Sequence, residues 1–323
     1  MQNLDVQDST SAAPQVVVLI PCYNEEQTIQ TVVQDFQKSL PEAKIYVYDN
    51  NSSDCTVEIA QKAGAIVRSE NLQGKGHVIR RMFSDIDADV YIIVDGDDTY
   101  DASAAPALID ALINGSLDMV NGRRIEQVRE AYRPGHRFGN WMLTKIVTTF
   151  FGERTKDMLS GYRAFSRRFV KSFPALSMGF EIETELTVHA LELKMPISDI
   201  DTRYKERPEG SESKLNTIQD GIRIFKTIAT LIKEERPLEF FSFLSLILGV
   251  ISIVAAYPVF IEYLDTGLVP RFPTAIFASA LMLLAFLCFF SGVILSTVTN
   301  GRKEMKRLIY LQYGSVETLR KDK

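Results

Sequence analysis

The sequence is poor in cysteine: its 323 residues contain only Cys22, Cys55 and Cys288. These three lie far apart and are odd in number, so no disulfide framework and no cysteine zinc site can be built from them. The chain also lacks a surplus of basic residues, and its net charge of -5 argues against a nucleic-acid partner. An anionic ligand must therefore be held by a local basic cluster.

The first 14 residues lack the apolar run of a signal peptide. They are polar and acidic, so we expect a loose tail. No internal repeat or low-complexity tract is visible in the rest of the chain.

From Gln15 to about Lys214, short β-rich runs alternate with amphipathic helical stretches. We expect strands at residues 16–20, 44–48, 65–68, 90–94, 117–121 and 197–204. Helices are expected at residues 25–40, 54–63, from 74 onward, and at 181–194. This alternation predicts an α/β domain with a mostly parallel sheet, in which ligands bind beyond the carboxyl ends of the strands.

Two long apolar runs, Phe240–Tyr263 and Ala275–Val298, each exceed the about 20 residues that cross a bilayer. The preceding segment, Thr217–Arg236, has apolar residues at helical spacing and basic residues elsewhere, which favours an amphipathic helix in the membrane interface over a soluble core helix. Basic residues flank the pair of runs, whereas Arg271 is the one positive charge between them. The positive-inside rule therefore predicts a multi-pass inner or plasma membrane protein with the catalytic domain and both termini in the cytoplasm.

The sequence thus predicts five parts. They are a flexible tail (1–14), a catalytic domain (15–214), a juxtamembrane amphipathic helix (215–238), two transmembrane helices (239–300) and a cytoplasmic tail (301–323).

The acidic group Asp95-Gly96-Asp97 follows the fourth expected strand directly. Two carboxylates one residue apart can reach one hard cation, and Mg²⁺ binds through one or two carboxylates together with substrate phosphates. Such an ion would neutralise a departing diphosphate. The alternative is an ordinary acidic turn.

Three further groups suit a nucleotide. Pro21 to Glu25 follows the first strand, with Tyr23 placed to pack against a base, and Asp49 ends the second strand. Gly74-Lys75-Gly76 opens a helix and can bring backbone N–H groups and an ammonium to a phosphate. Turn chemistry and helix capping are the alternative explanation.

Together these motifs resemble glycosyltransferase family 2, which has the GT-A fold. The later segments Arg133…Arg137…Asn140, Asp157-Met158-Leu159-Ser160-Gly161-Tyr162-Arg163 and Arg207…Ser213-Lys214 resemble dolichol-phosphate mannose synthases and bacterial undecaprenyl-phosphate glycosyltransferases. The Gln-x-x-Arg-Trp signature of processive polysaccharide synthases is absent, because the one tryptophan, Trp141, follows Asn140. This argues against a polymerase.

The resemblance implies inverting transfer of a sugar from a UDP- or GDP-sugar to a polyisoprenyl phosphate, with Mg²⁺ or Mn²⁺ as cofactor. It implies roles for three groups of residues. The donor would be held by Pro21, Tyr23, Glu25, Asp49, Lys75, Asp95, Arg207 and Lys214. Asp95 and Asp97 would bind the metal, and the acceptor phosphate would meet Arg123, Arg133, Arg137 and Ser160. Asp97, Arg133 and Arg137 are the expected catalytic residues.

Two alternatives stay open. A family 2 enzyme acting on a hydroxyl of a glycolipid or diacylglycerol would need a base such as Glu183 or Glu185, although a solvated or structural acidic face explains Glu181, Glu183 and Glu185 as well. A non-enzymatic sugar-nucleotide sensor or flippase subunit is the other. The sequence leaves open the sugar, the nucleotide base, the lipid length, whether the chain forms a homo-oligomer, and which of Arg123 and Arg124 faces the site.

Overall fold

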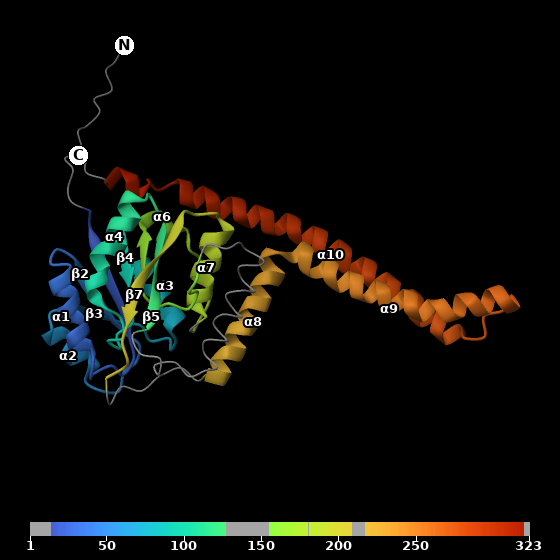
Figure 1. The fold of residues 1–323 in the computed structure, drawn as a ribbon, viewed down its shortest axis with the longest axis horizontal. Coiled ribbons are helices and arrows are strands. Elements are labelled where there is room, and N and C mark those ends of the chain that lie inside the picture. The colour runs from blue at the N-terminus through green and yellow to red at the C-terminus, as the bar shows by residue number, and fades with distance from the viewer. Residues whose placement is uncertain (1–13, 127–154, 180, 209–216, 320–323) are drawn as a thin grey trace, which may run out of the picture. The chain divides into compact units, whose positions relative to one another are not determined.

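A computed structural model gives the fold of the protein, and it describes residues 14–126, 155–179, 181–208 and 217–319 (Figure 1). The chain divides into two compact units. The first comprises Met1–Phe225 together with Lys306–Lys323, and the second comprises Lys226–Met305.

A seven-stranded sheet forms the centre of the first unit, in the order β3-β2-β1-β4-β6-β5-β7. Its strands are β1 (Val16–Cys22), β2 (Lys44–Asp49), β3 (Ile66–Ser69), β4 (Val90–Ile93), β5 (Met119–Glu126), β6 (Arg163–Ser166) and β7 (Ile197–Tyr204). β6 runs antiparallel to both of its neighbours, and every other pairing is parallel. The predicted mostly parallel α/β sheet is confirmed, and β6 is the strand that the sequence pattern did not predict.

Helices cover both faces of this sheet (Figure 1). They are α1 (Ile29–Ser39), α2 (Thr56–Lys62), α3 (Lys75–Asp85), α4 (Ala105–Asn114), α6 (Arg167–Ser172) and α7 (Ile182–Glu192), with a 3₁₀ turn η1 (Ala102–Ala104). Alternate residues of β1 point to opposite faces, so Val18 and Ile20 join the core under α1 and α4, whereas Val17 and Leu19 join the core under α3, α6 and α7. β1 is therefore buried on both sides, as its unbroken apolar sequence predicts.

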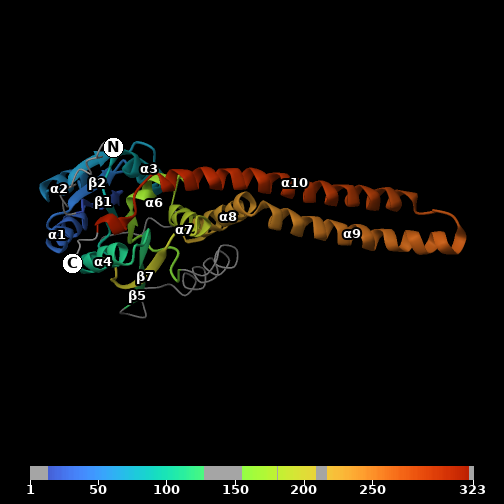
Figure 2. The same cartoon turned by 90° about the horizontal axis from the view of Figure 1, so that it is seen from above.

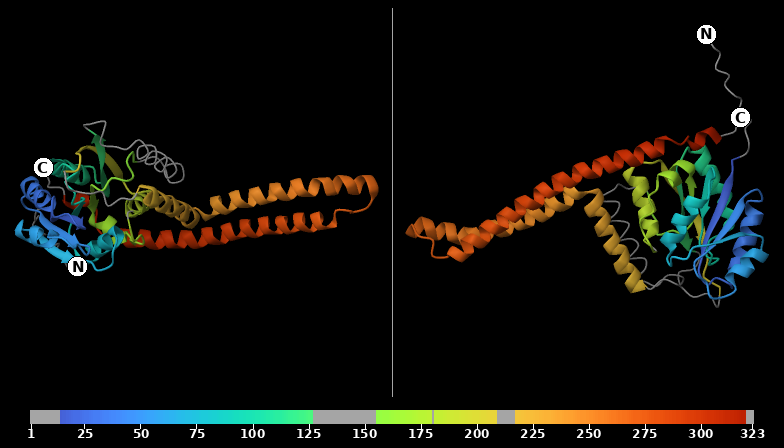
Figure 3. Two further views of the ribbon diagram at one scale, coloured as in Figure 1. Left: turned by 90° about the horizontal axis from the view of Figure 1, so that it is seen from below. Right: turned by 180° about the vertical axis from the view of Figure 1, so that it is seen from behind.

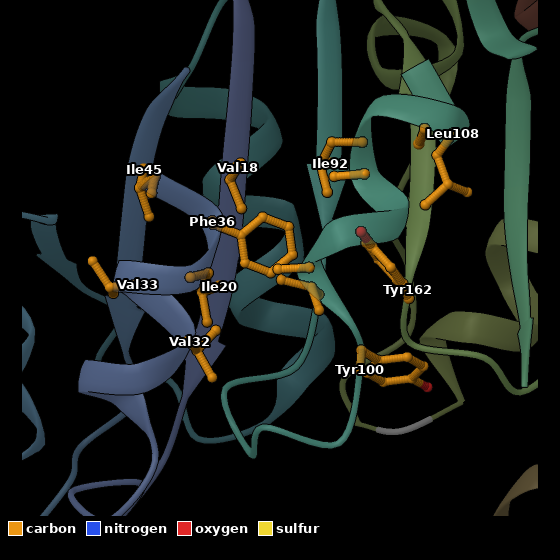
Figure 4. Close-up of a cluster of buried hydrophobic side chains, with 14 of the residues drawn as sticks. Val18, Ile20, Val32, Val33, Phe36, Ile45, Ile92, Tyr100, Leu108 and Tyr162 are labelled. Atoms are coloured by element: carbon orange, nitrogen blue, oxygen red, sulfur yellow. The ribbon is translucent and has the colours of Figure 1, made fainter. Parts of the chain in front are cut away.

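The first of these cores is closed by aromatic contacts between distant segments (Figure 4). The ring of Phe36 on α1 meets Tyr162 edge-on, with centroids 6.0 Å apart, and Tyr162 packs on Tyr100 at 5.5 Å. Tyr162 lies in the loop before β6 and Tyr100 lies beyond β4. This packing joins the loop that follows β4 to the loop that leads into β6, at the same end of the sheet.

Helix α1 begins at Ile29, four residues later than the pattern predicts. The backbone N–H of Glu25 donates to Thr56 Oγ1, and the hydroxyl of Thr28 donates to the carbonyl of Gly96. Residues 25–28 are therefore bound to neighbouring loops instead of lying within the helix.

The end of the chain returns to the first unit. Tyr310 donates its hydroxyl to Asp118 Oδ2 at 2.8 Å and lies 4.6 Å from the guanidinium of Arg168, while Lys306 pairs with Glu192 at 2.8 Å. Val316, in the turn η2 (Val316–Leu319), is buried in the core under α4. Residues 306–316 thus pack as part of the first unit.

The second unit is a helical hairpin of α9 (Pro237–Thr266) and α10 (Phe272–Leu311) up to Met305, preceded by the end of α8 (Thr217–Glu235) from Lys226 onward (Figures 2 and 3). Ser245 and Ser252 donate to the carbonyls of Ala285 and Ala278 at 2.8 and 2.7 Å. The buried positions of α10 recur every seven residues, at Ala278, Ala285, Gly292 and Thr299. Small residues at this spacing let the two backbones approach closely, as in membrane helix pairs.

Both helices are long and apolar enough to cross a membrane. Only 11% and 17% of their most apolar stretches are buried within the protein, so most of their leucine, isoleucine and phenylalanine side chains face outward. A core helix of a soluble protein is mostly buried, so this exposure distinguishes α9 and α10 from such helices.

Candidate active site

The loops that follow β1, β2 and β4 meet at the carboxyl end of the parallel strands. The backbone N–H of Asn24 donates to Ser52 Oγ at 2.9 Å, which joins the first two loops. The hydroxyl of Thr28 donates to the Gly96 carbonyl at 2.6 Å, which joins the first loop to the acidic group after β4. These bonds place the predicted nucleotide and metal residues around one site.

Asp95 lies at the centre of this site and pairs with Lys75. The Lys75 Nζ is 2.5 Å from Asp95 Oδ1 and also 2.5 Å from Glu183 Oε1 on α7. The lysine side chain is only 10% exposed. Burial would lower the pKa of Lys75, but the charges of Asp95 and Glu183 outweigh it and raise that pKa, so the ammonium stays charged.

Asp97 is bound by a different set of partners. Its carboxylate accepts from the backbone N–H and the hydroxyl of Thr99, and it pairs with Arg207 Nη2 at 2.5 Å. Burial and the neighbouring charge of Asp95 raise the pKa of Asp97 above its ordinary value, against the opposing effect of Arg207. A cation at this site is therefore favoured by both carboxylates.

The segment 157–163 closes the site from the side of β6. A Cβ on Gly161 would lie 2.4 Å from Asp95 Oδ2, and the Gly161 N–H donates to Tyr100 Oη at 2.8 Å. The hydroxyl of Ser160 is buried and donates to the Gly122 carbonyl at 2.6 Å. The backbone of this segment thus forms a wall directly against Asp95.

The two adjacent arginines of β5 have different partners. Arg124 forms a bidentate pair with Asp157, at 2.8 and 2.7 Å, and its guanidinium lies 5.6 Å from the ring centre of Tyr204. Arg123 pairs with Asp201, which is half exposed. Arg124 therefore belongs to the network around the site, while Arg123 is bound to the neighbouring strand β7.

The nucleotide side of the site is built on the end of β2. Asp49 is buried and accepts from the backbone N–H of Ser52 at 3.3 Å. The side chain of Asn50 donates to the carbonyls of Glu70 and Leu72 and accepts from the N–H of Gly74, all within 2.8 Å. Asn50 thereby holds the loop that leads into Lys75. Gly74 has a φ of 132°, which favours glycine at this position.

The sum of the acidic groups gives the site a negative field. Burial raises the pKa of the Cys22 thiol well above its ordinary value, and the charges of Glu25, Asp49, Asp95 and Asp97 raise it further. Among the described residues, no third histidine, cysteine or carboxylate joins Asp95 and Asp97 in a metal-binding cluster. Two hard oxygen donors with Lys75 and Arg207 as counter-charges fit an ion that takes its other ligands from phosphates and water.

Of the predicted residues, the structure brings together Glu25, Asp49, Lys75, Asp95, Asp97 and Arg207. Pro21 is partly buried between the buried Ile20 and Cys22 of β1, and Tyr23 follows this strand with 39% of its surface exposed. Arg133, Arg137 and Lys214 lie outside the described residues. The roles of all these residues, like those of Arg123 and Ser160, stay predictions.

Sequence reasoning named Glu183 only as a candidate base of the hydroxyl-acceptor alternative and did not predict its pair with Lys75. A solvated or structural acidic face was the other explanation of Glu181, Glu183 and Glu185, and its solvated form is wrong because all three are buried. Glu181 and Glu185 accept from backbone N–H groups of residues 176–179. The signal for burial was the surrounding apolar sequence of α7, in which acidic residues at every second position cannot all face water.

Comparisons with known proteins identify the family of this chain. The family model described as "Glycosyl transferase family 2" matches residues 17–173. Glycosyltransferase AglJ of Haloferax volcanii is 36% identical over 228 residues, which cover 70% of this chain and 75% of that protein. The chain belongs to glycosyltransferase family 2.

Two further proteins are similar to this glycosyltransferase. The dolichyl-phosphate hexose transferase of Haloferax volcanii is 30% identical over 221 residues, or 68% of this chain and 95% of that protein. Glucosyl-3-phosphoglycerate synthase of Mycobacterium tuberculosis, solved with Mn²⁺ and UDP-glucose, superposes with a TM-score of 0.55 at 21% identity, over 68% of this chain and 78% of that one. The catalytic unit of this glycosyltransferase therefore has the GT-A fold, as the sequence motifs predict.

Proposed function

We propose that this glycosyltransferase moves a hexose from a UDP- or GDP-sugar onto the phosphate of a polyisoprenyl phosphate, such as undecaprenyl or dolichyl phosphate. The product would be a lipid-linked sugar donor for a cell-envelope glycan or for protein glycosylation. Two helices that could cross a membrane support a lipid acceptor. The names of the dolichyl-phosphate hexose transferase and of a dolichol-phosphate mannosyltransferase from Pyrococcus furiosus, 26% identical over 184 residues, support a polyisoprenyl one.

One observation favours a phosphate over a hydroxyl as the nucleophile: the two candidate bases are already bound. Glu183 is paired with the Lys75 ammonium, and both carboxylate oxygens of Glu185 accept from the N–H groups of Leu176 and Ser177. A hydroxyl acceptor needs a base within reach of its proton. A phosphomonoester has a second pKa near ~6, so it enters as an anion and needs none.

The site then acts mainly through electrostatics, by placing positive charge beside the phosphate groups of the two substrates. An oxygen of the lipid phosphate attacks the anomeric carbon as the bond from that carbon to the nucleotide diphosphate breaks, with inversion. The bonding electrons leave with the nucleoside diphosphate, and no proton has to be removed. Lys75 and Arg207 would carry positive charge to this leaving group, and Asp49 and Tyr23 would orient the nucleoside.

Asp95 and Asp97 would hold Mg²⁺ or Mn²⁺. Such an ion would supply electrostatic stabilisation of the diphosphate as negative charge develops on it. The GT-A synthase solved with Mn²⁺ and UDP-glucose supports this choice of cofactor.

The proposed setting is the cytoplasmic face of the inner or plasma membrane, with both chain termini on that side. The basic residues Arg302, Lys303, Lys306 and Arg307 after the apolar part of α10 support this orientation.

A donor and acceptor screen tests the proposal. The purified full-length chain is incubated with undecaprenyl or dolichyl phosphate, a panel of UDP- and GDP-sugars and Mn²⁺ or Mg²⁺, and the lipids are read by mass spectrometry. The matched control acceptors are the corresponding polyisoprenol, which lacks the phosphate, and diacylglycerol. We expect a sugar adduct on the phosphate only. Transfer to the free alcohol or to diacylglycerol, and not to the phosphate, would support the hydroxyl-acceptor alternative.

A further inference from the structure

We propose that Glu183 is a positioning residue for Lys75: it keeps the lysine ammonium in the site when a divalent cation binds the Asp95 carboxylate. The inference rests on the proposed use of a metal and a nucleotide-sugar, and it gives the site a member that the family motifs did not indicate. Its basis is the pair of contacts at Lys75, 2.5 Å to Asp95 and 2.5 Å to Glu183.

The first step of the argument is that Lys75 shares one of the proposed metal ligands. A divalent ion bound to Asp95 would repel the Lys75 ammonium. It would also occupy the carboxylate with which that ammonium is paired. A lysine only 10% exposed then keeps its charge in place only if another anion stays beside it. Glu183, with 8% of its side chain exposed, is the second carboxylate already in contact.

The second step is that the backbone holds Lys75 and Glu183 in a fixed relation. A Cβ on Gly74 or Gly76 would lie 2.2 Å from the carbonyl oxygen of Met178 or Ser177, so both glycines pack directly on the loop before α7. The N–H of Gly76 also donates to the Met178 carbonyl at 3.1 Å. Lys75 is therefore locked to the segment from which Glu183 projects.

The third step is that the neighbouring glutamates have a separate task. Glu181 and Glu185 bind the N–H groups of residues 176–179 and so stabilise the loop itself. Glu183 is the one of the three that is paired with a site residue. With the ion bound to Asp95 and Asp97, Lys75 anchored on Glu183 would still be available to a phosphate of the donor.

The experiment measures binding instead of turnover. Isothermal titration calorimetry on the full-length chain in detergent gives the affinity for UDP and for GDP, each with Mn²⁺ present and absent. Glu183→Gln keeps the side-chain shape and removes the charge, and we expect it to weaken Mn²⁺-dependent nucleotide binding about tenfold. Lys75→Met should weaken it by a similar factor.

A double-mutant cycle decides whether Glu183 acts through Lys75. In the Lys75→Met background, Glu183→Gln should change the affinity by less than twofold. The matched control is Glu192→Gln, which removes a buried carboxylate on the same helix, where it pairs with Lys306. That variant should bind Mn²⁺ and nucleotide as the wild type does.

Two results with Glu183→Gln would overturn the proposal. One is unchanged binding in Glu183→Gln, and a second is an equal loss in the Lys75→Met background, which would make Glu183 a direct ligand. If Glu183→Gln fails to fold, the variant with Lys75→Met and Glu183→Met removes both charges of the pair, and it should bind as Lys75→Met alone does; weaker binding also refutes the proposal. Wild type that binds neither nucleotide with Mn²⁺ would instead contradict the proposed function itself.

Discussion

Gly161 faces the carboxylate of Asp95 so closely that a Cβ at position 161 would lie 2.4 Å from Asp95 Oδ2. Asp95 also meets Lys75 at 2.5 Å, so one aspartate is confined between a glycine backbone and an ammonium. The position of a proposed metal ligand thus depends on a residue that has no side chain.

Gly161→Ala should therefore displace Asp95 or the loop. A misplacement of about 1 Å at a reacting centre can cost about 100-fold in rate, and we expect a loss of that order in kcat/KM. Mn²⁺-dependent nucleotide binding should weaken as well, while the melting temperature changes by only a few degrees. Gly301→Ala is the control, because its Cβ would meet nothing within 4 Å. Full activity in Gly161→Ala would show that the loop moves without consequence.

Asn50 and Asn51 offer a matched pair of substitutions. Asn50→Asp loses two buried N–H donors and turns a carboxylate oxygen toward the Glu70 and Leu72 carbonyls, which should cost about 1–3 kcal/mol of stability. Because this loop carries Lys75, nucleotide binding should weaken too. Asn51→Asp makes the same chemical change at an exposed position and should have little effect on either. Thermal unfolding and calorimetry compare the two variants, and equal behaviour would contradict the role given to Asn50.

The buried His189 should make the folded catalytic unit less stable as the pH falls. Burial, and to a lesser extent the charge of Lys306, lowers the pKa of His189 from 6.5 to about 3. Below about pH 6.5 the unfolded chain therefore binds a proton that the folded chain does not, so stability falls as the pH falls toward 3. Between pH 6.5 and 5 this difference amounts to about 1.5 kcal/mol.

His189→Gln removes this titration. Its melting temperature should consequently fall less than that of the wild type between pH 6.5 and 5, measured by scanning fluorimetry in one detergent. Parallel pH curves for the two proteins would show that His189 does not contribute.

The proposed topology can be checked with thiol reagents. Leu268, in the turn between α9 and α10, is exposed, and so is the native Cys55 of the catalytic unit. In intact cells, a membrane-impermeant maleimide should label the Leu268→Cys variant at the new thiol and leave Cys55 unlabelled until the cells are lysed. The wild type is the control for labelling at native cysteines. Labelling of Cys55 in intact cells would reverse the proposed orientation.

Much of this fold could be predicted from local patterns. The run Val16–Ile20 is apolar at every position because β1 is buried on both faces, and the acidic groups after β2 and β4 lie where parallel strands end. Both apolar runs at the C-terminus form long helices, because a span of this kind is defined by length and composition alone.

The features that the sequence did not reveal all depend on distant partners. β6 is four residues long and forms because β4 and β5 pair with it on either side. Lys75 forms an ion pair with Glu183, which is more than a hundred positions away in the sequence. Tyr310 donates a hydrogen bond to Asp118, which is 192 positions away. Neither pairing leaves a local pattern, because each residue alone reads as an ordinary surface charge or aromatic.

The last prediction concerns the acceptor phosphate and the arginines expected to bind it. Arg123 and Arg124 already have carboxylate partners in Asp201 and Asp157. This favours Arg133 and Arg137, on either side of Pro134-Gly135, as the phosphate ligands. Arg133→Ala and Arg137→Ala should each raise the KM for polyisoprenyl phosphate and lower kcat, by about tenfold or more in kcat/KM, with little change in donor affinity.

Arg137→Lys distinguishes a guanidinium fork from simple charge. It keeps the positive charge but cannot bind two phosphate oxygens in parallel, so it should recover only part of the loss. The assay titrates the lipid phosphate at saturating donor, and calorimetry measures donor binding separately. Arg81→Ala is the control, because Arg81 is an exposed arginine paired with Asp85 on α3. Lipid kinetics that stay unchanged in both alanine variants would remove these arginines from the acceptor site, and the argument for a phosphate acceptor would then rest on the bound state of Glu183 and Glu185.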